Sequence, residues 1–156
     1  MNEKHVNESN DTPSREELII RGLSVKNVFD FENAFYWFSH PTRINKLLAQ
    51  YEIYKTIIGI PGDVFELGVF KAASLIRLAA FRNTLENDYS RKIVGFDAFG
   101  KFPTENLSMK SDLDFVNQFE GVGGQGLTID EVEKVLKHKS FNHIQLRKGN
   151  IFKTLP

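Results

Sequence analysis

The period of the hydrophobic pattern changes along the chain, and each change marks a predicted element. Before residue 59 apolar side chains recur at helical spacing, whereas three short apolar runs further on are typical of buried strands. These runs predict strands at 63–67, 92–96 and 143–148. Between them the pattern predicts helices at about 71–87, 112–119 and 129–138, the last preceded by a capping box from Thr128 to Glu131. This order of elements predicts a βαβ unit followed by a third strand.

The first 58 residues differ in composition from the rest. Residues 1–13 are rich in Asn, Glu, Ser and Asp, which predicts a disordered tail. Ser14-Arg15-Glu16-Glu17 forms a capping box and predicts the start of a short helix. A longer helix is predicted from Thr42 to about Ile58, before the Pro61-Gly62 pair. We therefore expect a helical segment over 14–58 and an α/β domain over 59–156.

Between these two helices lies an aromatic cluster. Phe31, Phe35 and Phe38 recur at helical spacing, with Tyr36 and Trp37 beside them. The spacing predicts a helix with a broad apolar face. Because aromatic side chains are usually buried, we expect this face to pack in the core rather than to stack on a substrate.

Composition narrows the range of functions. At 156 residues, with 41% apolar residues and 14 Phe, the chain can fill one core of ordinary size. Twenty basic residues balance twenty acidic ones, so the global charge gives no reason to expect nucleic acid as a partner. The absence of cysteine excludes a disulfide framework, a thiolate metal cluster and a cysteine nucleophile. Neither an apolar leader nor a run near the roughly 18 residues of a membrane helix is present, which favours a cytoplasmic protein without a membrane partner.

The three predicted strands make only part of a doubly wound sheet. In such a sheet they would lie in the order 3-2-1, with further strands on the other side of strand one. One flank of strand one would then be unpaired, an exposure that natural domains avoid by pairing or covering the edge. We therefore expect either the N-terminal half of a longer protein or a homo-oligomer that completes its sheet by association.

The turn after the first predicted strand has the features of a cofactor-binding loop. Gly68 permits close approach of a ligand to the main chain, and the helix that begins near Phe70 directs free N–H groups toward the same space. Such a site suits a carboxylate or a phosphate. A dinucleotide fingerprint would have further glycines where this chain has Ala72 and Ala73, so pyrophosphate binding is disfavoured.

Three polar side chains near this turn are candidate binding residues. Glu66 lies in an apolar strand, where it has to be paired, either with backbone N–H groups or with a cationic group such as an amino acid's ammonium. Asp97 ends the next predicted strand and can accept hydrogen bonds from two ribose hydroxyls or form an ordinary turn before Ala98. Ser74 can donate to a cofactor or satisfy the start of its own helix.

Two further features bear on ligand binding: two aromatic residues that flank the predicted cleft, and a glycine-rich run further along the chain. Phe99 and Phe102 follow the second strand, where an aromatic ring can cover an adenosine or pack under the loop. The run Gly121-Val122-Gly123-Gly124-Gln125-Gly126 looks like a phosphate-binding loop, but it follows no predicted strand and has no lysine at the required position. We therefore predict that it is a flexible hinge.

At these residues the chain resembles the macrocin O-methyltransferase family, S-adenosylmethionine-dependent enzymes that methylate sugar hydroxyls in natural products and glycans. The resemblance spans about 43–156. Its marks are Gly62-Asp63 leading into Glu66-x-Gly68-Val69, Asp97-Ala98-Phe99 followed by Phe102-Pro103, and Gly149-Asn150 with Thr154-Leu155-Pro156. It implies the N-terminal half of a Rossmann-like class I methyltransferase, an α/β fold with three parallel strands in the order 3-2-1 and flanking helices.

The resemblance also implies a site for S-adenosylmethionine. Glu66 and Gly68 would meet the methionine part, Asp97 the ribose, and Asn150 would lie near the adenine. The sequence departs from the family at Ala72, where a glycine is usual, and at Asn150, where an acidic residue is usual. The full set of predicted cofactor-binding residues is Glu66, Gly68, Val69, Phe70, Ser74, Asp97, Ala98, Phe99 and Asn150.

By the same resemblance the reaction is in-line transfer of the sulfonium methyl to a deprotonated hydroxyl of a sugar or glycan. The family's catalytic groups and acidic segment, which in some members holds Mg²⁺, follow a fourth strand that this sequence does not contain. No catalytic or metal-binding residue is therefore predicted, and this chain alone is expected to be inactive. Two alternatives remain: a non-catalytic cofactor-binding or assembly module, and part of a nucleotide-dependent oxidoreductase.

Overall fold

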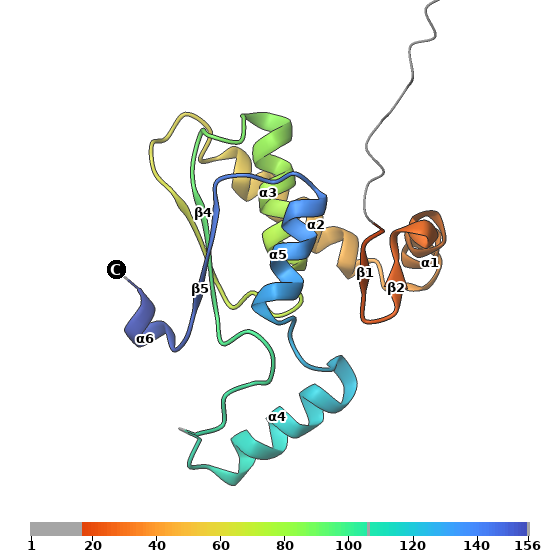
Figure 1. Ribbon diagram of the computed structural model, residues 1–156, viewed down its shortest axis with the longest axis vertical. Helices are drawn as coiled ribbons and strands as arrows, with labels where there is room; N and C mark the ends of the chain where they lie inside the picture. Colours follow the sequence, from red (N-terminus) through yellow and green to blue (C-terminus); the bar gives the residue numbers. More distant parts are fainter. Residues whose placement is uncertain (1–16, 106, 156) are drawn as a thin grey trace, which may run out of the picture.

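The computed structural model describes residues 17–105 and 107–155 (Figure 1). A 3-10 turn at Val25–Asn27 connects β2 to α1. No helix in these two ranges is long and apolar enough to cross a membrane. The elements, in chain order, are β1 (Ile19–Ile20), β2 (Leu23–Ser24), α1 (Val28–Phe38), α2 (Thr42–Lys55), β3 (Val64–Leu67), α3 (Ala73–Leu85), β4 (Ile93–Asp97), α4 (Lys110–Gly123), α5 (Ile129–His138), β5 (Ile144–Lys148) and α6 (Ile151–Thr154).

The main sheet is parallel and contains β3, β4 and β5 side by side in that order. Ile93 at the start of β4 is level with Val64 of β3 and with Ile144 of β5, so all three strands run in register toward the same edge. The predicted order 3-2-1 is confirmed, and the predicted first and last residues of each strand differ from the observed ones by at most one residue. Helices provide the crossovers that parallel neighbours require, with α3 between β3 and β4 and α4 and α5 between β4 and β5.

The core lies between one face of this sheet and the helices α3 and α5, with α2 beside α3 (Figure 1). Gly95 of β4 allows this close packing, because a Cβ there would lie 2.8 Å from Cγ2 of Val69 and 3.3 Å from Leu75. The buried core residues are Val69, Ala72, Leu75, Ala79, Ile93, Phe99, Leu127, Val132 and Leu136.

The opposite face of the sheet is less covered. Phe65 and Leu67 of β3 point to it and are 46% and 55% exposed, although the ring of Phe65 packs edge-on against Phe96 with 5.4 Å between centroids. Among the described residues β3 pairs only with β4, so the prediction of one unpaired flank on the first strand is confirmed.

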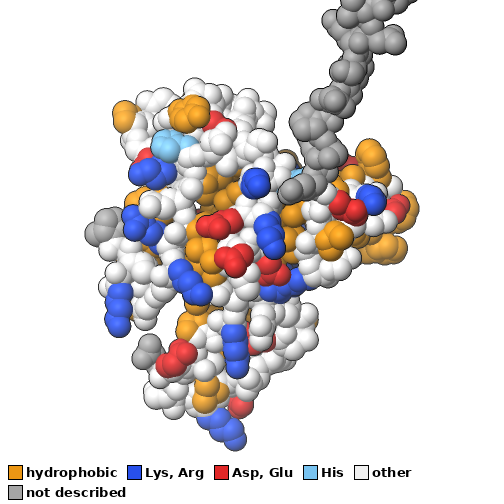
Figure 2. Space-filling view, viewed as in Figure 1, with side chains coloured by type: hydrophobic (Ala, Val, Ile, Leu, Met, Phe, Trp, Pro, Cys, Tyr) orange, Lys and Arg blue, Asp and Glu red, His pale blue; other side chains and the backbone are white. Residues whose placement is uncertain are grey.

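The N-terminal part departs from the prediction in two places. The helix expected from Ser14 falls mostly outside the described residues, and Glu17–Ile20 are extended, with β1 and β2 forming a short antiparallel hairpin. The aromatic helix is present as α1, but none of its residues is buried. Trp37 and Phe38 are 71% and 81% exposed, and Figure 2 shows hydrophobic side chains at the end of the molecule that α1 forms. The prediction that these rings pack in the core is therefore wrong.

A buried arginine connects α3 to the start of the sheet. Arg82 is fully buried and donates from Nη2 to Asp88 at 2.7 Å and to the Asn142 carbonyl oxygen at 2.6 Å. Its Nη1 donates to the carbonyl oxygens of Arg91 and His143, at 3.0 and 3.2 Å. One side chain thus satisfies carbonyl groups from the segments that precede both β4 and β5, which fixes these strands relative to the helix.

Candidate functional site

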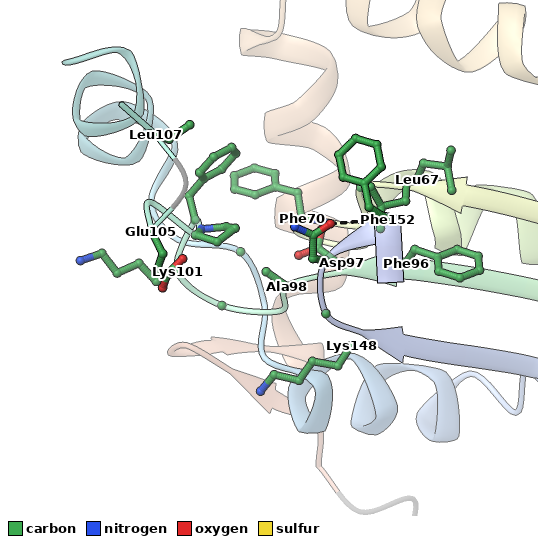
Figure 3. A pocket seen from close by; sticks show the side chains of 18 of the residues that line it. Leu67, Phe70, Phe96, Asp97, Ala98, Lys101, Glu105, Leu107, Lys148 and Phe152 are labelled. Carbon is green, nitrogen blue, oxygen red and sulfur yellow. Dashed lines mark hydrogen bonds between the residues drawn. The ribbon is translucent and has the colours of Figure 1, made fainter. Parts of the chain in front are cut away.

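A cavity of about 810 Å³ opens at the carboxyl ends of the three parallel strands (Figure 3). Gly68 lies just after β3, Asp97 ends β4, and Gly149 follows β5, and all three line it. Ligands of open α/β sheets bind outside this edge, and cavities of 300–1,000 Å³ are typical of small-molecule sites. The cavity is therefore the leading candidate for a ligand site.

Asp97 connects the loops on two sides of this cavity. Its Oδ2 accepts hydrogen bonds from the backbone N–H groups of Val69, at 2.7 Å, and Phe70, at 2.9 Å. Its Oδ1 accepts from the backbone N–H of Phe99 at 2.7 Å. A carboxylate has about four acceptor positions, so three are used within the protein and little capacity remains for a ligand. The turn-forming reading of Asp97 is thus confirmed, while ribose binding by the same group stays a prediction.

The corner between β3 and α3 is open. Gly68 has a φ of 98°, and a Cβ added there would meet no atom within 4 Å. The backbone around the cavity is strained, because Phe70, Ala72 and Phe99 also have positive φ, three of the six such non-glycine residues in the described ranges. Strain of this kind persists only where the surrounding structure holds it and is common at functional sites. The predicted close approach to the main chain at Gly68 is therefore sterically feasible.

Glu66 faces the helices rather than the cavity, since side chains alternate along β3 and its neighbour Leu67 lines the cavity. Its Oε2 is buried and has no hydrogen-bond partner among the described residues. Burial raises the pKa of Glu66 to about 7, and the charge of Asp97 raises it further, whereas a hydrogen bond from Ser74 and the charges of Lys46 and Arg77 lower it. This carboxyl group can accept another donor or a cation.

A short polar network surrounds that carboxyl group. Gln50 of α2 donates from Nε2 to the hydroxyl oxygen of Ser74 at 3.1 Å. The side-chain oxygen of Gln50 in turn accepts from Nη1 of Arg77 at 2.8 Å. The hydroxyl oxygen of Ser74 is therefore held by α2 through Gln50.

The glycine run after residue 120 forms part of the cavity wall. Gly121 and Gly123 lie in the last turn of α4, and Gly126 is buried. A Cβ at Gly126 would lie 3.0 Å from the Gly100 carbonyl oxygen and 3.2 Å from that of Phe70, which also accepts from the Leu127 N–H at 2.8 Å. At Gly126 the run packs against the backbone of Phe70 and Gly100, so the prediction of a flexible hinge is wrong at that position.

The cavity brings together five of the nine predicted cofactor-binding residues. They are Gly68, Phe70, Asp97, Ala98 and Asn150.

The remaining four lie elsewhere. Glu66 and Ser74 lie on the helix side of β3, while Val69 and Phe99 are core residues that reach the site only through the backbone N–H groups they donate to Asp97. Phe99 is therefore under the loop rather than at the mouth, whereas Phe102 lines the cavity as expected.

Asn150 lines the cavity with part of its amide already engaged. Its Oδ1 accepts from the Phe152 N–H at 2.9 Å and caps the short helix α6. The amide group therefore has less acceptor capacity for an adenine than predicted, because its oxygen is used in the cap.

Other lining residues did not appear among the sequence candidates. Lys148 ends β5 and Gly126 packs under Phe70, and both line the cavity, as do Phe119 and Glu120 of α4. Asp97 became a candidate because it ends a predicted strand, and Lys148 could have been selected on the same ground. Within 17–105 and 107–155, no three His, Cys, Asp or Glu side chains come together as a potential metal site.

Replacing Asp97 by Asn is expected to lower the free energy of unfolding by about 1–3 kcal/mol, because an amide NH₂ would then face at least one buried backbone donor. Chemical denaturation would measure the change, and hydrogen exchange at Val69 and Phe70 should become faster. Asp63→Asn is the matched control, since Asp63 is exposed and accepts one backbone N–H, from Lys92 at 3.0 Å. Equal losses in the two variants would contradict a bridging role for Asp97.

No protein-family model and no curated protein matches the chain. Among solved structures it is similar to the O-methyltransferase NovP, with a TM-score of 0.61 and 19% identity over 72% of this chain and 48% of that one. It is also similar to CalS11, a calicheamicin methyltransferase, with a TM-score of 0.51 and 20% identity over 81% and 52% of the two chains. The chain spans about half the length of the solved structures that it matches. Its α/β fold, with a parallel three-stranded sheet and flanking helices, is similar to part of the Rossmann-like fold of NovP.

Proposed function

We propose that this chain binds S-adenosylmethionine at the cavity and forms the cofactor-binding part of an O-methyltransferase. The observation that carries this proposal is the open corner at Gly68 beside Asp97, at the carboxyl edge of a sheet with a methyltransferase fold. The proposed acceptor, a hydroxyl of a sugar or glycan, is that of the family that the sequence resembles.

The residues present fit such a cofactor. Gly68 leaves room for a ligand against the main chain, and the cavity volume of about 810 Å³ suits a nucleoside-sized molecule. The buried oxygen of Glu66 that lacks a partner has the charge and acceptor capacity that an ammonium group requires. Because Glu66 lies on the helix side of β3 and does not line the cavity, this pairing requires the amino-acid end of the cofactor to extend past Gly68 toward α3.

When bound, S-adenosylmethionine would supply an electrophilic methyl group on a sulfonium. The chain's own residues would bind and orient it: the main chain at Gly68 beside the amino-acid end, Glu66 toward the ammonium, and Asp97 near the ribose. Phe102 would cover the mouth and reduce access of water. Orientation of this kind is the main contribution that a protein makes to such a transfer.

Calorimetric titration with S-adenosylhomocysteine and with NADH tests the proposal. We expect binding of S-adenosylhomocysteine and weaker or undetectable binding of NADH. Preferential binding of NADH would favour the oxidoreductase alternative and overturn the proposal. Weak or undetectable binding of both ligands would favour the alternative of a non-catalytic assembly module.

A pair of glycine substitutions tests the binding site more specifically. Gly68→Val should weaken binding of S-adenosylhomocysteine at least about tenfold, because the side chain would fill the corner and strain a backbone with positive φ. Gly62→Val is the control, since Gly62 at the other end of β3 also has a positive φ, 137°, and no atom within 4 Å of its added Cβ. Similar affinity losses in both variants would mean that Gly68 serves the fold alone.

A further inference from the structure

Arg21 of the N-terminal hairpin contacts a loop that is remote from it in sequence. Its Nε and Nη2 donate to the two carboxylate oxygens of Glu131, at 2.9 and 3.0 Å. Its Nη1 donates to the Gln125 carbonyl oxygen at 2.8 Å, and Nη2 also donates to that of Gly126 at 2.7 Å. One guanidinium group thus holds both the carbonyl groups of the loop and the first turn of α5.

The left-handed backbone conformation of Arg21 costs free energy, and the hydrogen bonds of its side chain offset that cost. Arg21 and Gly22 connect β1 to β2 with φ of 49° and 80°, which are the left-handed values of a tight two-residue hairpin turn. Asn or Asp, rather than Arg, is usually found at the first of these positions. The four hydrogen bonds from the side chain stabilise a residue that the turn itself disfavours.

The loop that Arg21 holds is part of the cavity wall. Gly126 lines the cavity, and the N–H of Leu127 donates to the Phe70 carbonyl oxygen at 2.8 Å. On its other side Phe70 donates its own N–H to Asp97 at 2.9 Å. A continuous series of hydrogen bonds and backbone contacts therefore leads from the hairpin to the carboxylate at the cavity floor.

The ion pair at the outer end of this series is well formed. Hydrogen bonds from Arg21 and from the backbone of Thr128 lower the pKa of Glu131 to about 2. The two side chains are 39% and 22% exposed, so the pair lies at the rim rather than in the core. A rim contact contributes little to global stability, and it can still fix the position of a loop.

We propose that Arg21 is a positioning residue for the cofactor site, acting as a latch that holds residues 125–127 against Phe70 and so keeps the cavity wall in place. This inference rests on the proposed function, because the ligand it concerns is S-adenosylmethionine. The latch assigns a role to the N-terminal hairpin, which otherwise makes no contact with the cavity. Preorganisation of a wall before binding increases affinity by reducing the ordering cost.

The test compares Arg21→Ala, Arg21→Lys and Lys26→Ala by titration with S-adenosylhomocysteine and by amide hydrogen exchange of Leu127. Lys26→Ala is the matched control, because it removes the other ion pair of the hairpin region, from Lys26 to Glu17 at 2.8 Å. Arg21→Ala should weaken binding about fivefold to tenfold and accelerate exchange at Leu127. Arg21→Lys, which keeps the charge but not the forked geometry, should restore part of both, and Lys26→Ala should change neither.

Three outcomes overturn the proposal, and the first can be distinguished from the other two. If the unmodified chain fails to bind S-adenosylhomocysteine, the proposed function fails and the latch fails with it. If the unmodified chain binds and Arg21→Ala binds equally well, the latch alone is overturned. An affinity loss of the same size in Lys26→Ala would also overturn it, because the effect would then reflect general loosening of the hairpin.

Discussion

Between pH 4.5 and pH 7 the free energy of unfolding is expected to decrease by about 3 kcal/mol through Glu66 alone. Burial raises the pKa of this carboxyl group from 4.5 to about 7 in the folded chain. In that window the native state holds a proton that the unfolded state has released. The contribution of Glu66 to stability is therefore fully present below pH 4.5 and is lost as the pH rises through 7.

Chemical denaturation across this window, with Glu66→Gln beside the unmodified chain, measures the effect. The neutral amide cannot ionise, so the difference between the two curves isolates Glu66 from the other titrating groups. The charged groups that affect the pKa of Glu66 are Lys46 on α2, Arg77 on α3 and Asp97 on β4, and all are present in both proteins. Glu133→Gln, an exposed change on α5, should leave the pH dependence unaltered. Parallel curves for Glu66→Gln and the unmodified chain would show that Glu66 ionises equally in both states.

The ionisation of Glu66 also predicts how strongly the proposed ligand protects the chain against unfolding at different pH values. Above pH 7 an ionised Glu66 without a partner costs free energy, and an ammonium group placed beside it would offset that cost. S-adenosylhomocysteine should therefore protect the chain against unfolding more strongly above pH 7 than below it. Ligand protection that does not change with pH would separate Glu66 from the ammonium site.

Arg82→Met is expected to lower the free energy of unfolding by about 3–5 kcal/mol, the usual effect of removing one member of a buried ion pair. Methionine has a similar length, so packing is largely kept while the polar partners lose their donor. Asp88 and three backbone carbonyl groups would be left without this guanidinium. Because single domains are stable by only about 5–15 kcal/mol, such a loss is a large share of the total.

Urea denaturation followed by circular dichroism would measure this loss. Arg43→Met, an exposed substitution on α2, is the control and should change stability by less than about 0.5 kcal/mol. Should Arg82→Met fall within that same small range, the carbonyl groups must find other donors, and the role given to Arg82 would be wrong.

The sequence pattern predicted the parallel sheet because strand runs and helix periods are local properties. It also located the cavity edge, since Gly68 and Asp97 mark strand ends. It did not predict that Asp97 would bind the N–H groups of Val69 and Phe70, because those donors face it only after β3 and β4 pair. The twofold alternation of a strand, applied to Glu66 and Leu67, would have placed these two side chains on opposite faces.

The errors have a common physical origin. Helical spacing shows that α1 has an apolar face, but it cannot show which surface covers that face, and Trp37 and Phe38 are exposed. Likewise a glycine-rich run shows where side chains are absent, but not whether solvent or another backbone occupies the space. At Gly126 the backbone of Phe70 occupies it.

A substitution at Gly95, although far from any ligand, would shift the loop beside the cavity. The nearest atom to an added methyl group there belongs to Val69, at 2.8 Å, and the N–H of Val69 is one of the donors to Asp97. A larger residue would push Val69 outward and with it the loop above the sheet. A mutational scan should therefore count this position in the middle of β4 among the intolerant ones, although it is buried and carries no reactive group.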